Sequence, residues 1–382
     1  MRHSLLSKFQ GALLGAAVGD CLGVQYQNQL LGMRVQTENW QPILKLTKHQ
    51  QLSLAGAMFG LSSANGKHSN SKTPSECGRL AVAGAQSLIR CSTLDLKDWR
   101  DTWEAFTKFE LYNPRSTEFQ TILNPSEAAV AALPAAMFFH ENTAKLREKL
   151  LLATEVWHHQ TAREWQMGVL ATGYPIARAL KEKLNPATAI AQTIAYLETD
   201  NALTEMLSQV QILLEQGADL EKAATQLWKT AKTLGENAGD RDNKLPINAT
   251  VNPVNLMPIV LAFYCFLSTP EDLRLSVMRA ARCGIAGQLT CALTGALSGA
   301  YNGAAAIPVE WRQTLSIAGV GSGANEGRES SLWGAERDGK IVELATKLFA
   351  VWAGVYSPEG VSESSAQVPV VTAPYVIRPH KI

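Results

Sequence analysis

The stretch CGIAGQLTCALTGALSGAYNG, residues 283–303, decides what kind of fold this chain adopts. It contains no carboxylate, and its Gly295, Gly299 and Gly303 lie four residues apart. In a helix, this spacing places the three glycines on one face. Each helical glycine costs about 0.5–1 kcal/mol relative to alanine, so a neighbour close to the backbone must compensate. The stretch therefore predicts a helix that contacts another helix or a ligand closely, and the spacing alone favours two packed core helices.

The run GALLGAAVGDCLG near the N-terminus has the same spacing, with Gly11, Gly15, Gly19 and Gly23. It predicts a second helix with a bare glycine face. In membranes such a stripe marks a helix dimerisation face, but the charge of Asp20 and the short apolar length argue against a membrane helix here.

Most of the remaining chain repeats apolar residues at intervals of three and four, which is the helical pattern, and β-branched alternation is scarce. Helix starts are expected after Asn185 and Thr269, each of which precedes a proline. The sequence predicts an all-α fold, a compact multi-helix domain. The segments with the clearest helical pattern are SECGRLAVAGAQSLIR, EAAVAALPAAMFF, EWQMGVLATGYPIARALKEKL, DLEKAATQLWKTAKTL, DLRLSVMRAARCG and KIVELATKLFAVWAGVY.

Length and composition suit one large domain or two, since 46% of the 382 residues are hydrophobic and 18% are charged. Polar stretches beginning at Gly60, Gly235 and Gly319 are expected to be surface loops, because helical patterning continues on both sides. We therefore expect one all-α domain over residues 1–355. The Pro/Val/Ser-rich segment 356–382 is expected to be an extended or disordered tail.

The charge balance and the apolar runs argue against several classes of partner, and the cysteine usage indicates the compartment. The 35 Lys and Arg nearly balance 34 Asp and Glu, which gives no footprint for nucleic acid or an anionic membrane. The apolar run LMPIVLAFYCFL is too short to span a bilayer. The six cysteines are never spaced C-x-x-C and suit small core residues in a reducing compartment. We expect a soluble, cytoplasmic protein.

Four segments, taken in chain order, resemble the ADP-ribosylglycohydrolase family over roughly residues 5–320. GALLGAAVGDCLG is similar to the opening helix of the family, and SECGRLAVAGAQSLIRCSTLDLKDW to the helix after its first metal-binding motif. ATEVWHHQTAREWQMGVLATGYPIARAL resembles the segment around its Thr-His motif, and TCALTGALSGAYNGAAAIPVEWRQTL its closing segment. The resemblance implies an all-α fold with a cleft that, in active members, holds two magnesium ions and removes ADP-ribose from a modified side chain.

The resemblance also shows where the family's metal ligands would fall, in a Thr-Asp-Asp-Thr and an Asp-x-Asp-Thr motif. The first motif aligns with Ser75, Glu76, Cys77 and Gly78, and the second with Ala286, Gly287, Gln288 and Leu289. Glu76 is the one carboxylate among these positions. Because Mg²⁺ takes oxygen ligands and a pair of ions brings a charge of +4, we expect no two-metal centre and no cofactor.

Other positions of the family's site are changed as well. Its Asn-Gly stretch falls on Ser126 and Glu127 and its arginine on Ala131, whereas His158 keeps the histidine of the Thr-His motif.

Two interpretations of the candidate residues stay open. Glu76 and Cys77 would form an acid and thiol pair or, as we favour, a charged helix start and a buried thiol. His158 would be a general base or a structural histidine. The residues that we select as possible ligand-binding groups are Asp20, Glu76 and His158.

Three functional hypotheses follow. The first is a catalytically inactive homologue that serves as a scaffold or binds a protein partner. KIVELATKLFAVWAGVY, with the tail behind it, would be a docking element or the last core helix. The second is a module that binds ADP-ribose or a nucleotide weakly without metal, and the third is a hydrolase with altered chemistry that uses Glu76 and His158.

Overall fold

The computed structural model describes residues 3–32, 76–110, 124–156, 163–241, 252–284, 286–317, 333 and 338–355, and every regular element in these ranges is a helix. The prediction of an all-α fold is therefore confirmed. The α-helices are α1 (Leu5–Gly32), α3 (Glu76–Cys91), α4 (Leu96–Glu110), α5 (Pro125–Ala131), α6 (Leu133–Phe138), α7 (Thr143–Ala153), α8 (Arg163–Leu180), α9 (Ala189–Leu197), α10 (Ala202–Glu215), α11 (Leu220–Arg241), α12 (Met257–Ser268), α13 (Leu273–Cys283), α14 (Gly287–Asn302), α15 (Val309–Ile317) and α16 (Asp338–Trp352). Short 3₁₀ turns are η2 (Thr154–Val156), η3 (Pro186–Thr188), η4 (Pro253–Leu256) and η5 (Ala304–Ala306).

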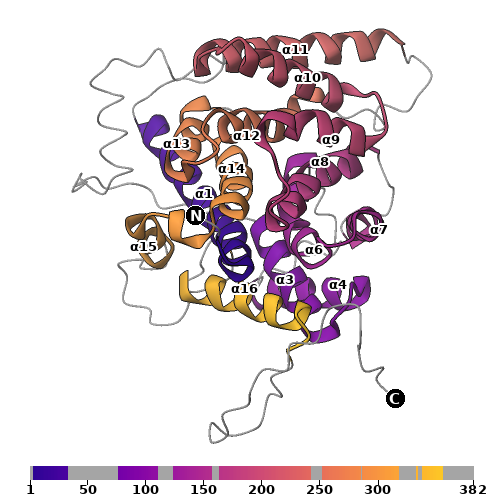
Figure 1. Ribbon diagram of the computed structural model, residues 1–382, viewed down its shortest axis with the longest axis vertical. Helices are drawn as coiled ribbons and strands as arrows, with labels where there is room; N and C mark the ends of the chain where they lie inside the picture. Colours follow the sequence, from indigo (N-terminus) through magenta and orange to yellow (C-terminus); the bar gives the residue numbers. More distant parts are fainter. Residues whose placement is uncertain are drawn as a thin grey trace, which may run out of the picture.

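Helices α1 and α14 lie antiparallel at the centre of the molecule (Figure 1) and meet along their glycine faces. A Cβ atom built on Gly11 would lie 2.6 Å from the carbonyl carbon of Gly303, and one built on Gly23 would lie 2.5 Å from Cα of Gln288. Such distances are too short for real carbon atoms, so only glycine allows the two backbones to approach this closely. We call this contact the glycine seam, and it is formed by Gly11, Gly15, Gly19 and Gly23 on α1 with Cys291, Gly295, Gly299 and Gly303 on and after α14. The predicted packing of two core helices is confirmed.

Further helices cover this central pair on several sides. Helices α8, α12 and α13 contact α14, whereas α16 and α15 contact α1 (Figure 1). Helices α10 and α11 form an outer pair at the top of the view, on the far side of α12. The buried core draws residues from Phe9 on α1 to Leu348 on α16.

Helix α16 packs against the start of α1 through aromatic side chains. The Phe9 ring lies 5.5 Å from the Phe349 ring and 5.9 Å from the Trp352 ring, centroid to centroid. His140, which is 2% exposed, lies between Phe9 and Trp352, at 5.5 and 4.9 Å, and its Nδ1 donates to the carbonyl of Met137. Of the two interpretations of this segment, the structure favours the core helix.

Three local predictions need correction. The segment EAAVAALPAAMFF forms two helices, α5 and α6, because Pro134 opens a new first turn instead of continuing the old one. Thr269 ends α12, and the side chain of Asp272 caps α13 by accepting from the N–H of Leu275 at 2.8 Å. Helix α11 continues through Gly235 to Arg241, so the loop expected from Gly235 begins later. The predicted cap Asn185 is confirmed, since it accepts from the N–H of Ala187 at 3.1 Å.

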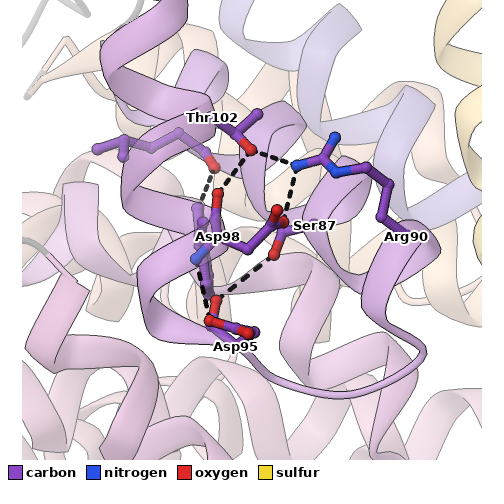
Figure 2. A network of polar contacts seen from close by, with 7 residues as sticks. Ser87, Arg90, Asp95, Asp98 and Thr102 are labelled. Carbon is purple, nitrogen blue, oxygen red and sulfur yellow. Dashed lines mark hydrogen bonds and ion pairs between the residues drawn. The ribbon is translucent and has the colours of Figure 1, made fainter.

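A polar network closes the turn between α3 and α4 (Figure 2). Arg90 pairs with Asp98 at 2.7 Å and also donates to Thr102, while Asp95 accepts from the N–H of Asp98 at 2.9 Å. Ser87 donates to the carbonyl of Asp95 at 3.5 Å. The network links the C-terminal end of α3 to α4, and the other end of α3 carries the predicted site residues.

The cysteines behave as the sequence suggests. Five of the six are buried and all six are free thiols. Sγ of Cys265 lies 3.7 Å from Sγ of Cys283 inside the core. Burial raises the pKa of the Cys265 and Cys291 thiols well above the usual range, so both are neutral and unreactive.

Within the described ranges, each helix is too short or too polar to span a lipid bilayer. The segment expected to form the tail, residues 356–382, and the loops from Gly60 and Gly319 lie outside those ranges, apart from Trp333.

Candidate functional site

A cleft opens at the end of the glycine seam where α14 begins, beside the part of α1 that follows Gly23. Its volume is about 270 Å³. The walls come from the second half of α1 and from the N-terminal ends of α3, α5 and α14. The residues that line it are Gln27, Glu76, Cys77, Glu127, Ala286, Gln288 and Leu289.

The turn that enters α14 has an unusual backbone. Gly284 ends α13 with φ +71°, and Ala286 precedes α14 with φ +40°. The left-handed region suits glycine but is strained for alanine by about 1–2 kcal/mol. This geometry directs Ala286, Gln288 and Leu289 toward the cleft, and no side chain caps the N-terminus of α14.

Asp20 lies beneath the cleft and is 1% exposed. Its Oδ1 accepts a hydrogen bond from Nε2 of Gln288 at 2.7 Å, and its Oδ2 accepts one from Nε1 of Trp333 at 2.7 Å. Both bonds are charge-assisted, because the acceptor is a carboxylate and the donors are neutral N–H groups. We call Asp20, Gln288 and Trp333 the Asp20 clamp.

Trp333 occupies space that Gly78 leaves free. A Cβ atom on Gly78 would lie 2.5 Å from Cε2 of Trp333, so any larger residue at this position would collide with the indole. Trp333 is 1% exposed. The indole therefore packs directly on the first turn of α3, beside the carboxylate that it binds.

Glu127 combines a capping role with a place in the cleft wall. Its Oε2 accepts from the N–H of Asn124 at 2.7 Å, and Asn124 Oδ1 accepts from the N–H of Glu127 at 3.0 Å, which forms a capping box at the start of α5. Burial raises the pKa of the Glu127 carboxyl, the N–H of Asn124 opposes this, and the nearby charge of Glu76 adds to the rise. Glu127 thus holds its proton to a higher pH than an ordinary glutamate.

The structure brings together most of the residues that the sequence selected. Glu76 is exposed at the start of α3, and Cys77 beside it is buried. The selected residues that line the cleft are Glu76, Cys77, Ala286, Gln288 and Leu289, with Gly78 and Asp20 directly beneath. Ser75 and His158 lie outside the described residues.

Two participants were not anticipated as site residues. Gln27 follows the glycine run on α1 by four residues and reaches the cleft, and Trp333 reaches Asp20 from between α15 and α16. A sequence signal for Trp333 does exist, since a single tryptophan in the polar stretch GVGSGANEGRESSLWG is out of keeping with a surface loop.

Two larger hollows, of about 410 and 740 Å³, lie elsewhere and contain none of the residues that the sequence selected. Across the described part of the chain, no three His, Cys, Asp or Glu side chains converge in a way that would hold a metal ion.

Comparison with known proteins gives the family. The family model of ADP-ribosylglycohydrolase matches residues 1–353. Among solved structures, an ADP-ribosylglycohydrolase-related protein complex is similar with a TM-score of 0.55 and 15% identity, covering 91% of this chain and 99% of that chain. At this identity, the likeness supports the fold alone. No curated protein matches the sequence. Because the family model covers nearly the whole chain, the protein belongs to the ADP-ribosylglycohydrolase family.

Proposed function

We propose that this chain is a non-hydrolytic member of its family, a folded scaffold that serves a protein partner. The observation that supports the proposal is the Asp20 clamp, in which two neutral N–H donors bind the buried carboxylate. The resemblance to active family members implies metal ions in this region. A carboxylate held in this way is already satisfied by the protein.

The donor set of the cleft does not fit a pair of magnesium ions. Ala286 and Leu289 have no side-chain oxygen, and Gln288 has one neutral carbonyl and uses its Nε2 on Asp20. The two carboxylates in the wall are Glu76 and Glu127, and Glu127 is engaged with the N–H of Asn124. Octahedral Mg²⁺ needs several anionic oxygens at about 2.0–2.1 Å, and two ions need enough of them to offset +4.

Size and charge also disfavour ADP-ribose in the cleft. The volume of about 270 Å³ is below the range of about 300–1,000 Å³ that is usual for ligand pockets. Among the described residues that line it are Glu76 and Glu127 but neither lysine nor arginine. A diphosphate would therefore face carboxylates without a cation to offset its charge.

Calorimetric titration of the purified chain with ADP-ribose, with and without Mg²⁺, tests the proposal. We expect no heat of binding in either buffer and no Mg²⁺-dependent release of ADP-ribose from a modified arginine or serine. Binding near 1 μM, about −8 kcal/mol, or release that requires Mg²⁺ would overturn the proposal.

A gain-of-function variant provides the matched control. The double substitution Ala286→Asp and Gln288→Asp returns carboxylates to two of the positions that align with the family's second motif. We expect Mg²⁺ to raise the Tm of this variant and to leave that of the wild type unchanged, because only the variant gains by binding the ion. An equal rise in both proteins would show that the wild-type cleft already binds the metal.

A second candidate is hydrolysis without metal, and the proximity of Glu127 to Glu76 favours it. Two carboxyl groups in one cleft, of which Glu127 has a raised pKa, are able to act as acid and base. This activity would persist in EDTA and fall in Glu127→Gln, whereas the scaffold proposal predicts no release of ADP-ribose in either case. The alternative pair of acid and base suggested by the sequence is Glu76 and His158, and His158 lies outside the described ranges.

The scaffold proposal also assigns roles to the parts of the chain. We propose that residues 1–355 form one folded domain and that the partner is a protein. Because α16 packs on α1 and α3, its apolar face serves the core, and a docking surface for the partner has to be sought elsewhere.

A further inference from the structure

We propose that the space against Gly78 and Asp20 is a binding site for an indole-type group, a flat aromatic ring with an N–H donor, and that the chain fills this site with its own Trp333. The inference concerns the floor of the cleft and does not depend on whether the chain hydrolyses ADP-ribose. Its failure and that of the scaffold proposal are therefore distinguishable.

The fit of the indole has a polar and an apolar component. The N–H of Trp333 donates to a carboxylate oxygen of Asp20 at 2.7 Å, and both residues are 1% exposed. The ring rests on Gly78, where a Cβ atom would lie 2.5 Å from Cε2. A site that recognises the ring by shape and its N–H by a buried carboxylate selects an indole over a purely hydrocarbon ring.

Gly78 supports the assignment from the side of the receptor. It lies in the first turn of α3, where alanine would be about 0.5–1 kcal/mol more favourable for a free helix. The close approach of Trp333 accounts for the glycine. The two residues are separated by about 250 positions in the sequence, so the match between them is a property of the site and not of one local motif.

A second tryptophan, which also packs against α3, provides an internal reference. Trp99 of α4 packs on Gly84 of α3, also with Cε2 at 2.5 Å from the place of a Cβ atom, and donates to the carbonyl of Leu80 at 3.0 Å. Both indoles therefore replace a side chain on α3, but Trp99 binds a neutral acceptor and Trp333 a carboxylate. Charge-assisted bonds are roughly twice as strong as neutral ones.

The test is rescue of the full-length Trp333→Ala variant with free indole, followed by thermal unfolding. We expect the Tm to fall on substitution, to rise saturably with indole, and to rise much less with N-methylindole, which fills the space without the N–H. Wild type should respond to neither compound. In Trp99→Ala, the difference between the two compounds should be smaller. Lack of response to indole in a folded Trp333→Ala variant, or an equal response to N-methylindole, would overturn the proposal.

A second measurement covers the case in which Trp333→Ala does not fold. In the full chain labelled with 5-fluorotryptophan, the resonance missing from Trp333→Phe identifies Trp333. We expect this ¹⁹F signal to show no H₂O/D₂O isotope shift in wild type, and to show one in Gly78→Ala, where the added methyl expels the ring. A solvent-exposed Trp333 signal in wild type would contradict the proposal.

Discussion

The glycine seam and the cleft are built from the same two helices, yet they follow different chemical rules. Along the seam, α1 and α14 touch backbone to backbone, and carbonyl groups of one helix lie where side chains of the other would be. At the end of the seam where α14 begins, polar side chains line a cleft, and Gln288 of α14 binds Asp20 of α1. The seam requires glycine wherever a Cβ atom would meet the opposite backbone, whereas the cleft requires only that its polar groups be satisfied.

This difference implies that residues in the cleft are able to change more readily than residues in the seam. Because the two backbones touch along the seam, every added methyl group would clash, and the seam cannot change without loss of the fold. A buried carboxylate needs compensating donors, and either a cation or N–H groups satisfy this need. In this chain Gln288 and Trp333 provide them, which leaves the frame intact.

The largest effect is expected from a methyl group in the seam. Gly295→Ala would place a Cβ atom 2.7 Å from the carbonyl carbon of Gly15, and backbone cannot yield as a side chain can. We expect the free energy of unfolding to fall by more than about 4 kcal/mol, an exceptional loss for one methyl. Urea denaturation of purified protein measures it.

Gly235→Ala on α11 is the matched control, since the added Cβ atom would lie at an ordinary 3.5 Å from Cδ of Pro253. This substitution should stabilise the protein by about 0.5–1 kcal/mol. If both substitutions had the same effect, the seam would not be the constraint that we describe.

The next effect is a loss of stability in acid at the opposite end of α1 from the cleft. Burial between Phe9 and Trp352 lowers the pKa of His140 to about 4, and the charge of Lys181 contributes in the same direction. Between about pH 6.5 and 4, His140 binds a proton in the unfolded chain but stays neutral in the folded chain. Stability should therefore be full above pH 6.5 and fall by about 3 kcal/mol as the pH approaches 4, at about 1.36 kcal/mol per unit.

Denaturant midpoints at a series of pH values measure this slope. His140→Gln removes the titrating group and should flatten the profile over that range, although other groups will still contribute below it. A wild-type profile with the same slope as His140→Gln would show that His140 is accessible to protons.

A smaller effect is expected in the cleft. Gln288→Ala removes one donor to Asp20 and should lower the free energy of unfolding by about 2 kcal/mol, within the range for a hydrogen bond to a buried charge. Gln27→Ala changes the same wall and leaves the bond between Gln288 and Asp20 in place, so it should change the free energy of unfolding by less than about 0.5 kcal/mol. Equal losses would mean that wall packing matters and the clamp does not.

The smallest effect is expected away from both regions, at the turn of Figure 2. Arg90 is 48% exposed and Asp98 is 30% exposed, so solvent screens their ion pair. Arg90→Ala should lower the free energy of unfolding by less than about 1 kcal/mol. A loss as large as that of Gln288→Ala would show that the turn, and not the buried Trp99, fixes α3.

Much of the architecture was predictable because helices follow from local patterns. Apolar residues spaced three and four apart predicted an all-α fold, and glycines spaced four apart predicted the seam from either helix alone. Where prediction failed, the competing signal was also local. Pro134 divides a pattern that periodicity alone extends through it, and Asp272 is a cap close to the threonine that was expected to be one.

The sequence by itself determined that the chain is helical and that two glycine faces need close partners. Only the tertiary structure decided which groups meet around Asp20. Asp20, Gly78, Gln288 and Trp333 are scattered over more than 300 residues, and no spacing rule connects them. Periodicity arises from the geometry of a single helix, whereas the clamp arises from how separate segments pack, so it becomes visible only when the chain is folded.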